Sequence, residues 1–301
     1  MKNNERRCGY VSIVGRPNVG KSTLLNALIG EKISIVSSKA HTTRDNILGI
    51  LNIFSDQIIF IDTPGLQLKR KSIINQLMAK SINQAIIDSD LIVLMIEASR
   101  INKQDYIFRD TIGKYSKKAI LVINKIDTIK NKDDLLPLLS KLHSDFNFLS
   151  YIPISARNNI NLKNLVEEIR INLPIAPILF SNDLITDKDR KFRIEEIIRE
   201  KVMINIHEEV PYGLKVQIEH MSEERKGVIF IHAVILVDKE SHKPILIGKN
   251  GKTLKHIGTL ARKDINRLFG IRSHIELWVK AKDSWSSSRD KLSDLDFNIE
   301  N

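Results

Sequence analysis

The sequence is poor in cysteine and in long apolar runs, and both shortages narrow the classes of protein it can encode. Its single cysteine, Cys8, excludes an internal disulfide and a cysteine-only zinc site, which fits a reducing cytosol. The longest apolar run, residues 228–237, is interrupted by His232 and is too short to cross a bilayer. The polar start at residues 1–7 predicts no signal peptide, so we expect a cytoplasmic protein.

Acidic residues are also in short supply relative to basic ones. The 301 residues include 47 Lys/Arg against 36 Asp/Glu, a net charge of +11 that predicts an anionic partner. The excess is local, because residues 241–280 contain nine Lys/Arg and only two Asp/Glu, whereas residues 181–240 contain ten and thirteen. A basic binding surface therefore explains the charge better than general solubility does. The length allows about two domains, and 42% apolar residues are enough for a full core.

Residues 15–22 carry the strongest motif in the chain. They read Gly-Arg-Pro-Asn-Val-Gly-Lys-Ser, which fits the phosphate-binding loop pattern of Gly, four residues and Gly-Lys-Ser/Thr. An apolar run at 9–14 predicts a buried strand before the loop, and helical spacing over 22–30 predicts a helix after it. Glycines let backbone N–H groups surround an anion, the lysine reaches the β- and γ-phosphates, and the serine offers a hydroxyl to Mg²⁺. The predicted nucleotide contacts are Gly15, Arg16, Pro17, Asn18, Val19, Gly20, Lys21, Ser22 and Thr23.

A second segment is expected to reach the same phosphates. Residues 47–54 and 57–61 read as strands joined by a tight turn, and the second strand runs directly into Asp-Thr-Pro-Gly. An aspartate at the end of a buried strand suits contact with Mg²⁺, direct or through another ligand, and a glycine lets its N–H approach a γ-phosphate. The predicted contacts are Asp62, Thr63, Pro64 and Gly65.

The polar stretch at residues 41–45 reads as a loop and contains Thr42 and Thr43. In a phosphate-loop nucleotidase, a threonine from such a loop completes the Mg²⁺ shell only when the γ-phosphate is present, which makes the loop a switch. Either threonine can supply this hydroxyl.

The motif at residues 124–127 selects the base. It reads Asn-Lys-Ile-Asp and follows a buried apolar strand at 119–123. An aspartate can accept two hydrogen bonds from the N1–H and amine of guanine, and adenine has no such pair of donors. The asparagine can bond the guanine edge and brace the phosphate loop, the lysine stem can lie across the base, and a later loop at 155–157 can offer a backbone N–H to guanine O6. The predicted base contacts are Asn124, Lys125, Asp127, Ser155 and Ala156.

Strands and helices alternate through this part of the chain. A continuous apolar run at 91–96 predicts a central parallel strand, and helices are expected at 69–90, 103–113, 133–146 and 161–172. Alternation with phosphate chemistry at the strand ends predicts an α/β domain with a doubly wound, mainly parallel sheet.

The order of these motifs resembles the Era family of translation-factor-related GTPases. The likeness rests on residues 42–44, 62–66 and 124–127. It implies an enzyme that hydrolyses GTP to GDP and phosphate, with Thr43 as the switch ligand and Thr42 as the open alternative. The implied metal ligands are Ser22, Thr43 and Asp62.

Leu66 occupies the position at which Ras-like GTPases carry a glutamine that orients the attacking water. Leucine cannot do this, so hydrolysis needs another source of help. The family resemblance implies that Asn18 holds a K⁺ ion, which donates charge near the transition state. The implied catalytic residues are Asn18, Lys21, Thr43 and Gly65.

A second domain follows two prolines, Pro174 and Pro177, which end the helical pattern. Its helices and strands are expected in the order α-β-β-α-α-β. The first helix is expected at 191–209, the strands at 214–220, 228–237 and 274–281, and two helices on either side of the loop at 248–251, the second at 253–269. A Gly-Lys-Asn-Gly loop at 248–251 resembles the GXXG loop of a type II KH domain, an α+β fold that binds single-stranded RNA. The predicted RNA contacts are Ile245, Ile247, Gly248, Lys249, Asn250, Gly251 and Lys252, with the two isoleucines as a floor for bases.

We therefore expect a GTPase domain at 1–174, a linker at 175–190, a KH domain at 191–283 and a tail at 284–301 without assigned chemistry. The resemblance implies a monomer that binds the 3′ end of small-subunit (16S) ribosomal RNA, assists small-subunit maturation and associates peripherally with the inner membrane. One alternative is a GTP-dependent RNA-modification or large-subunit assembly factor of a sister family. The KH domain argues against sister families that carry a helical domain or a duplicated GTPase domain in its place. Another is an RNA-binding module with a degenerate nucleotide site, and the complete set of nucleotide motifs argues against it.

Overall fold

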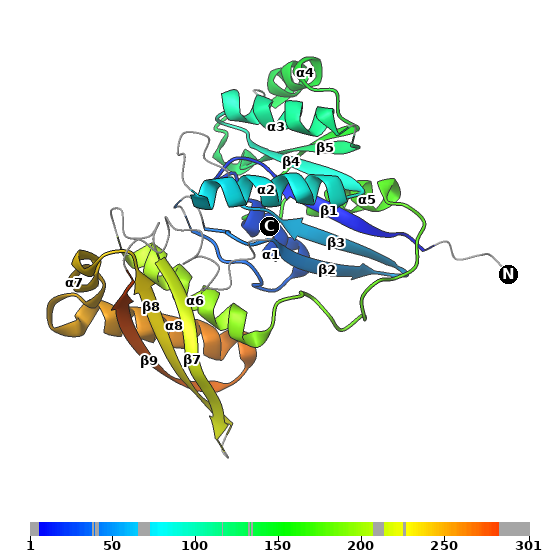
Figure 1. Cartoon of the computed structure of the whole chain (residues 1–301). Coiled ribbons are helices and arrows are strands. Elements are labelled where there is room, and N and C mark those ends of the chain that lie inside the picture. The colour runs from blue at the N-terminus through cyan, green and yellow to red at the C-terminus, as the bar shows by residue number, and fades with distance from the viewer. Residues whose placement is uncertain are drawn as a thin grey trace. The chain divides into compact units, whose positions relative to one another are not determined.

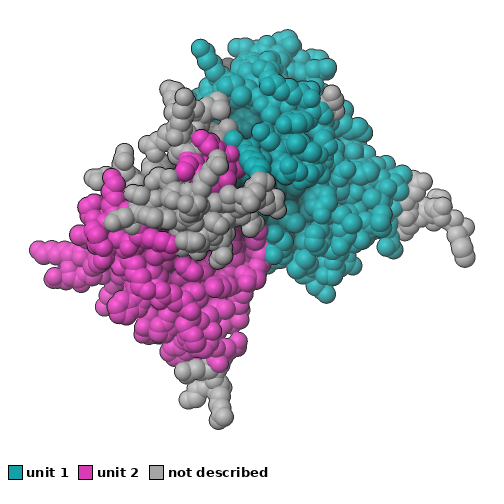
Figure 2. Space-filling view, in the orientation of Figure 1, with its two compact units in different colours: residues 1–34, 40–70, 78–187 teal, residues 35–39, 71–77, 188–301 magenta. Residues whose placement is uncertain are grey.

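The computed structural model divides the chain into two compact units (Figure 2). Unit 1 comprises residues 1–34, 40–70 and 78–187, and unit 2 comprises residues 35–39, 71–77 and 188–301. The structure describes residues 6–37, 39, 42–65, 73–115, 117–131, 133, 135–206, 214–224 and 227–282. The nucleotide motifs lie in unit 1 and the GXXG loop lies in unit 2.

Unit 1 is built on a six-stranded sheet with the order β2-β3-β1-β4-β5-β6 (Figure 1). All neighbours are parallel except β2 and β3, which form an antiparallel hairpin. The strands are β1 (Cys8–Val14), β2 (Ile47–Ile53), β3 (Asp56–Asp62), β4 (Leu91–Glu97), β5 (Ala119–Asn124) and β6 (Ser150–Pro153). The predicted doubly wound, mainly parallel sheet is therefore confirmed.

Within the described residues of unit 1, five α-helices accompany this sheet in sequence. They are α1 (Lys21–Ile29), α2 (Ile73–Asp88), α3 (Lys103–Lys114), α4 (Leu135–Asp145) and α5 (Leu162–Asn172). Apolar side chains of α2, α3 and α4 pack with alternate residues of β4 and β5 in one core cluster, whereas Figure 1 shows α1 and α5 toward the other face. Covering both faces explains why β4 and β5 read as continuous apolar runs.

Unit 2 contains a three-stranded sheet with the order β7-β8-β9 and the helices α6, α7 and α8. The elements run α6 (Arg190–Asn205), β7 (Leu214–Glu224), β8 (Val228–Val237), α7 (Lys243–Ile247), α8 (Lys252–Phe269) and β9 (Arg272–Ala281). This is the predicted α-β-β-α-α-β order. The first pair of strands is antiparallel and the second is parallel.

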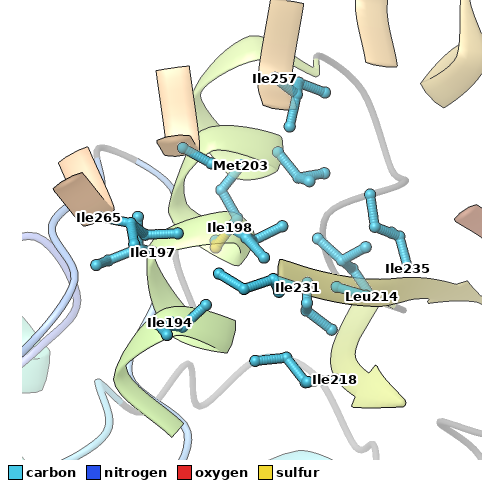
Figure 3. Packing of buried hydrophobic residues seen from close by; sticks show 14 of the residues in the cluster. Ile194, Ile197, Ile198, Met203, Leu214, Ile218, Ile231, Ile235, Ile257 and Ile265 are labelled. Carbon is cyan, nitrogen blue, oxygen red and sulfur yellow. The ribbon is translucent and has the colours of Figure 1, made fainter. Parts of the chain in front are cut away.

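The core of unit 2 forms between α6, α8 and one face of its sheet (Figure 3). Successive side chains of β8 point to opposite faces of the sheet, so that Ile231 and Ile235 point into this core. The labelled side chains come from two helices and two strands: Ile194, Ile197, Ile198, Met203, Leu214, Ile218, Ile231, Ile235, Ile257 and Ile265.

Two short segments from early in the sequence also belong to unit 2. Ile35 is buried in its main core, and the backbone N–H of Val36 donates to Glu200 Oε1 at 3.1 Å. On the opposite face of the unit 2 sheet, Val234 and Leu236 of β8 pack against Ile73, Ile74 and Leu77. Local sequence periodicity cannot reveal this grouping, because it does not say which sheet an apolar side chain covers.

In the described part of the chain, no helix is both long and apolar enough to span a bilayer.

Candidate nucleotide site and nucleic-acid interface

The phosphate-binding loop connects β1 to α1 and depends on glycine at both of its ends. Gly15 and Gly20 have φ angles of 151° and 104°, a region that side chains rarely adopt. A Cβ on Gly15 would collide with the carbonyl oxygen of Met95, and a Cβ on Gly20 would collide with the side-chain amide of Asn124. The loop is thus closely packed against the ends of β4 and β5.

Lys21, the first residue of α1, is buried inside this loop. Its Nζ donates to the carbonyl oxygens of Gly15 at 3.0 Å and Arg16 at 3.3 Å. Burial lowers the pKa of Lys21 to about 8, although the charge of Asp62 opposes the shift. A buried cation at the start of a helix suits a polyphosphate.

Three predicted metal ligands converge beside Lys21. Ser22 Oγ lies 2.7 Å from Asp62 Oδ2 and 3.0 Å from Thr43 Oγ1. Ser34 Oγ also donates to Asp62 Oδ2, at 2.8 Å. The other oxygen, Oδ1, is buried without a hydrogen-bond partner within the described residues, and burial raises the pKa of Asp62. An acceptor in this position calls for a cation.

The donor set fits Mg²⁺. Two hydroxyls and one carboxylate are hard oxygen ligands, and Mg²⁺ in such sites takes its remaining ligands from phosphate and water. Across the residues that the structure describes, no group of three or more His, Cys, Asp or Glu side chains is placed to hold a metal ion. Of the two candidate threonines, Thr43 is the one whose hydroxyl lies against Ser22 and Asp62.

The segment after β3 comes close to the phosphate loop. Thr63 Oγ1 donates to the carbonyl oxygen of Ile13 at 2.8 Å. A Cβ on Gly65 would lie 2.8 Å from the Cα of Pro17, too near for any larger residue without a backbone shift. Gly65 is therefore required by this close approach, and Leu66 lies outside the described residues.

The loop at residues 124–127, which begins at the end of β5 and was predicted to contact the base, is fastened to the phosphate loop. Asn124 Nδ2 donates to the carbonyl oxygen of Val19 at 2.7 Å, and Asn124 Oδ1 accepts from the backbone N–H of Ala156 at 3.0 Å. Ser155 Oγ donates to Asp127 Oδ1 at 2.5 Å, and its backbone N–H donates to the carbonyl oxygen of Ile160. The backbone N–H groups of Ser155 and Ala156 have these partners in the structure, and the Ser155 loop orients Asn124 and Asp127. The contact of this loop with guanine O6 stays a prediction.

The structure adds side chains that the motifs did not reveal. Arg16 was expected to contact nucleotide, yet its guanidinium is directed to Asp105, with Nε 3.2 Å from Oδ1, and to Glu97, with NH2 3.4 Å from Oε2. Only the backbone of Arg16 remains for the phosphates. The sole sequence signal for Glu97 is a charge at the end of the apolar run of β4.

In unit 2, the GXXG loop joins α7 to α8. Gly248, Asn250 and Gly251 have φ angles of 71°, 54° and 73°, and a Cβ on Gly248 would collide with Thr253. Lys249 and Asn250 are exposed, as is Lys252 at the start of the 18-residue α8. The loop therefore presents positive charge and a helix N-terminus, which together favour a phosphodiester.

A groove of about 410 Å³ continues from this loop between α8 and β9. Its floor is apolar, from Leu254, Ile275 and Leu277, whereas the predicted floor residues Ile245 and Ile247 do not line it. Gly258 lines the groove, and a Cβ added to it would make ordinary contact with the Leu277 side chain at 3.5 Å. The sequence does not show that α8 lies beside β9, so it did not indicate that Leu254, Ile275 and Leu277 share a groove. The other residues that line the groove are Gly251, Lys255, Thr259, Arg262 and His274.

Comparisons with known proteins match both units. Residues 10–125 match the family model described as 50S ribosome-binding GTPase, and residues 209–286 match the KH domain model. The chain is 42% identical over 297 residues to GTPase Era of Histophilus somni, which covers 99% of both chains. It is 43% identical to GTPase Era of Haemophilus influenzae, with 96% of each covered, and 45% identical to that of Nitrosomonas eutropha, with 97% and 98% covered.

Two solved structures resemble the whole chain. One is a variant of Era from Aquifex aeolicus bound to GDP·AlF4⁻, with 39% identity, a TM-score of 0.91, and coverage of 95% of this chain and 98% of that one. The other is Era in complex with MgGDPNP and nucleotides 1506–1542 of 16S ribosomal RNA, with 39% identity, a TM-score of 0.91, and 96% and 98% covered. Both likenesses therefore extend across the GTPase and KH portions.

Proposed function

This chain belongs to the Era family of GTPases, and from that membership we propose that GTP binding and hydrolysis in unit 1 control binding of the 3′ end of 16S ribosomal RNA by unit 2. The observation that carries the nucleotide half is the convergence of Ser22, Thr43 and Asp62 oxygens beside buried Lys21. The Era complex that contains both MgGDPNP and 16S RNA supports joining the two halves in one cycle.

In this proposal the phosphate end of GTP occupies the loop at residues 15–22. Lys21 neutralises the β- and γ-phosphates, and Ser22, Thr43 and Asp62 would hold Mg²⁺, which supplies positive charge to the phosphoryl oxygens. The backbone N–H of Gly65 approaches the γ-phosphate. Thr43 is preferred to Thr42 because its hydroxyl lies within 3.0 Å of Ser22 Oγ.

Recognition of guanine is assigned to Asn124, Lys125 and Asp127. Ser155 Oγ fixes one carboxylate oxygen of Asp127, which orients the group that would accept from guanine N1–H and the exocyclic amine. Ala156 acts on the base indirectly, by holding the Asn124 amide through its own N–H.

Attack by water needs help that Leu66 cannot give. Asn18, at a φ of 65° within the phosphate loop, is assigned as a K⁺ ligand. A monovalent cation beside the phosphates would supply charge as it accumulates in the transition state.

The RNA half of the proposal assigns phosphodiester contact to the loop at 248–252 and bases to the groove between α8 and β9. Lys249 and Lys252 contribute charge at the loop, and Arg262 contributes it along the groove. The biological role that follows is assistance in small-subunit maturation by a cytoplasmic monomer with peripheral inner-membrane contact. Its domains are assigned as 1–174, 191–283, the linker 175–190 and the tail 284–301.

Crosslinking of the full-length protein to RNA of the 16S 3′-end sequence, with a GTP analogue or GDP, tests this function. We expect more crosslinking with the analogue, and loss of at least tenfold when Lys249 and Asn250 are both changed to Asp, with GTP hydrolysis retained. Changing Lys163 and Asn164 to Asp is a matched control, because this pair is also adjacent and exposed but lies on α5. Equal crosslinking by both double variants would refute the assigned RNA site.

A further inference from the structure

The carboxyl end of β4 occupies a special place in the strand order of unit 1. The phosphate loop follows β1 and the base loop follows β5, and β4 lies between these two strands. Glu97, the last residue of β4, pairs in register with Asn124 at the end of β5. A side chain at this point can therefore reach both loops.

Glu97 contacts both loops with one oxygen. Its Oε2 lies 3.1 Å from Lys125 Nζ in the base loop and 3.4 Å from Arg16 NH2 in the phosphate loop. The other oxygen, Oε1, accepts from Ser99 Oγ at 3.2 Å. Burial alone would raise the pKa of Glu97, but the hydrogen bond and charge of Lys125, the charge of Arg16 and the hydrogen bond from Ser99 together hold that pKa below its ordinary value. The carboxylate is thus ionised under physiological conditions.

The contact between Glu97 and Arg16 helps to fix the phosphate loop. Arg16 is 7% exposed, and its guanidinium is also bonded to Asp105, a fully buried carboxylate that caps the N-terminus of α3. The carbonyl oxygen of the same arginine is one of the two acceptors of Lys21 Nζ. Fixing the Arg16 side chain therefore fixes part of the frame around the phosphate-binding lysine.

The contact between Glu97 and Lys125 helps to fix the loop assigned to the base. Lys125 has a φ of 65°, a left-handed conformation that costs a non-glycine residue free energy and requires support from its surroundings. Its ammonium group is held by Glu97, which sets the direction of the stem assigned to lie across guanine.

We propose that Glu97 is a positioning residue that couples the base loop to the phosphate loop through Lys125 and Arg16, so that each loop is in place when the other binds. The inference rests on the nucleotide site of the proposed function. It assigns Glu97 no contact with nucleotide, and it predicts energetic coupling between Arg16 and Lys125, two side chains linked here through Glu97.

A triple-mutant cycle on the full-length protein tests this inference, with GDP affinity measured by calorimetry. We expect Glu97→Gln to weaken GDP binding about tenfold. With Glu97 present, the loss of GDP affinity in the double variant Arg16→Gln/Lys125→Met should differ by at least about threefold from the product of the two single losses. In the Glu97→Gln background, the two losses should multiply within error. Multiplicative effects in both backgrounds would overturn the proposal, as would unchanged affinity in Glu97→Gln.

Two further variants separate positioning from general stability. Ser99→Ala removes only the partner of the other carboxylate oxygen and should leave GDP affinity unchanged, and a tenfold loss there would contradict the role of Oε2. Glu97→Asp keeps the charge but retracts it, and it replaces Glu97→Gln in the cycle if that variant fails to fold. Absence of GDP binding by the unmodified chain would instead refute the proposed nucleotide site itself.

Discussion

Proton uptake on nucleotide binding is the most direct consequence of the burial of Lys21. Burial lowers its pKa to about 8, so that part of the population is neutral at mildly alkaline pH. A bound polyphosphate favours the charged amine, because it brings negative charge next to Nζ. Binding must therefore protonate the fraction of Lys21 that was neutral, and nucleotide affinity falls as pH rises through 8.

The size of this effect follows from the pKa of about 8. Lys21 should take up about 0.1 proton per nucleotide at pH 7 and about 0.8 at pH 8.5, if the bound form is fully charged. The same calculation lowers GDP affinity about fourfold between these two pH values. The loss begins near pH 7 because at lower pH the lysine is already protonated before the ligand arrives, and it continues above pH 8.5 until the pH reaches the raised pKa of the bound lysine.

Calorimetry in buffers of different ionisation enthalpy measures this uptake. Lys21→Arg is the matched control, because arginine stays charged at both pH values. Subtracting its proton uptake removes contributions from the nucleotide itself. Equal uptake at pH 7 and pH 8.5, or the same increase in Lys21→Arg, would refute the argument that burial has depressed the lysine pKa.

Two other predictions concern the base and the monovalent cation. Asp127→Asn should shift preference from GTP toward xanthosine triphosphate, whose C2 oxygen accepts a hydrogen bond, and competition binding measures the ratio; an unchanged ratio would remove Asp127 from base recognition. Replacing K⁺ by Na⁺ should slow GTP hydrolysis at saturating GTP, and Asn18→Ala should abolish the difference between the two ions. Equal rates in K⁺ and Na⁺ for the unmodified chain would remove the role assigned to Asn18.

Contiguous motifs predicted the parts of the nucleotide site that one strand-loop-helix unit creates. Ser22 and Asp62 come from different motifs, yet the chemistry of each indicated Mg²⁺, and the fold brings their oxygens to 2.7 Å. The groove beside the GXXG loop is lined by Leu254, Ile275 and Leu277 rather than by Ile245 and Ile247, because it forms only when α8 lies beside β9. The contact of Ile245 and Ile247 with RNA bases stays a prediction. Helical and strand periodicity identify an apolar face but not the element that covers it.

The place of Glu97 could not be predicted for a different reason, because it depends on the order of the strands in the sheet rather than on periodicity. In sequence, its neighbours are the apolar residues of β4, and no motif includes it; in the sheet, its neighbours are the two loops that follow β1 and β5. The base loop is then tied to the phosphate loop twice, through Asn124 to Val19 and through Glu97 to Arg16. Bridges this short leave little freedom between those loops. We therefore expect a response to the γ-phosphate in the loops that carry Thr43 and Gly65, which meet the phosphate loop at Ser22 and Pro17.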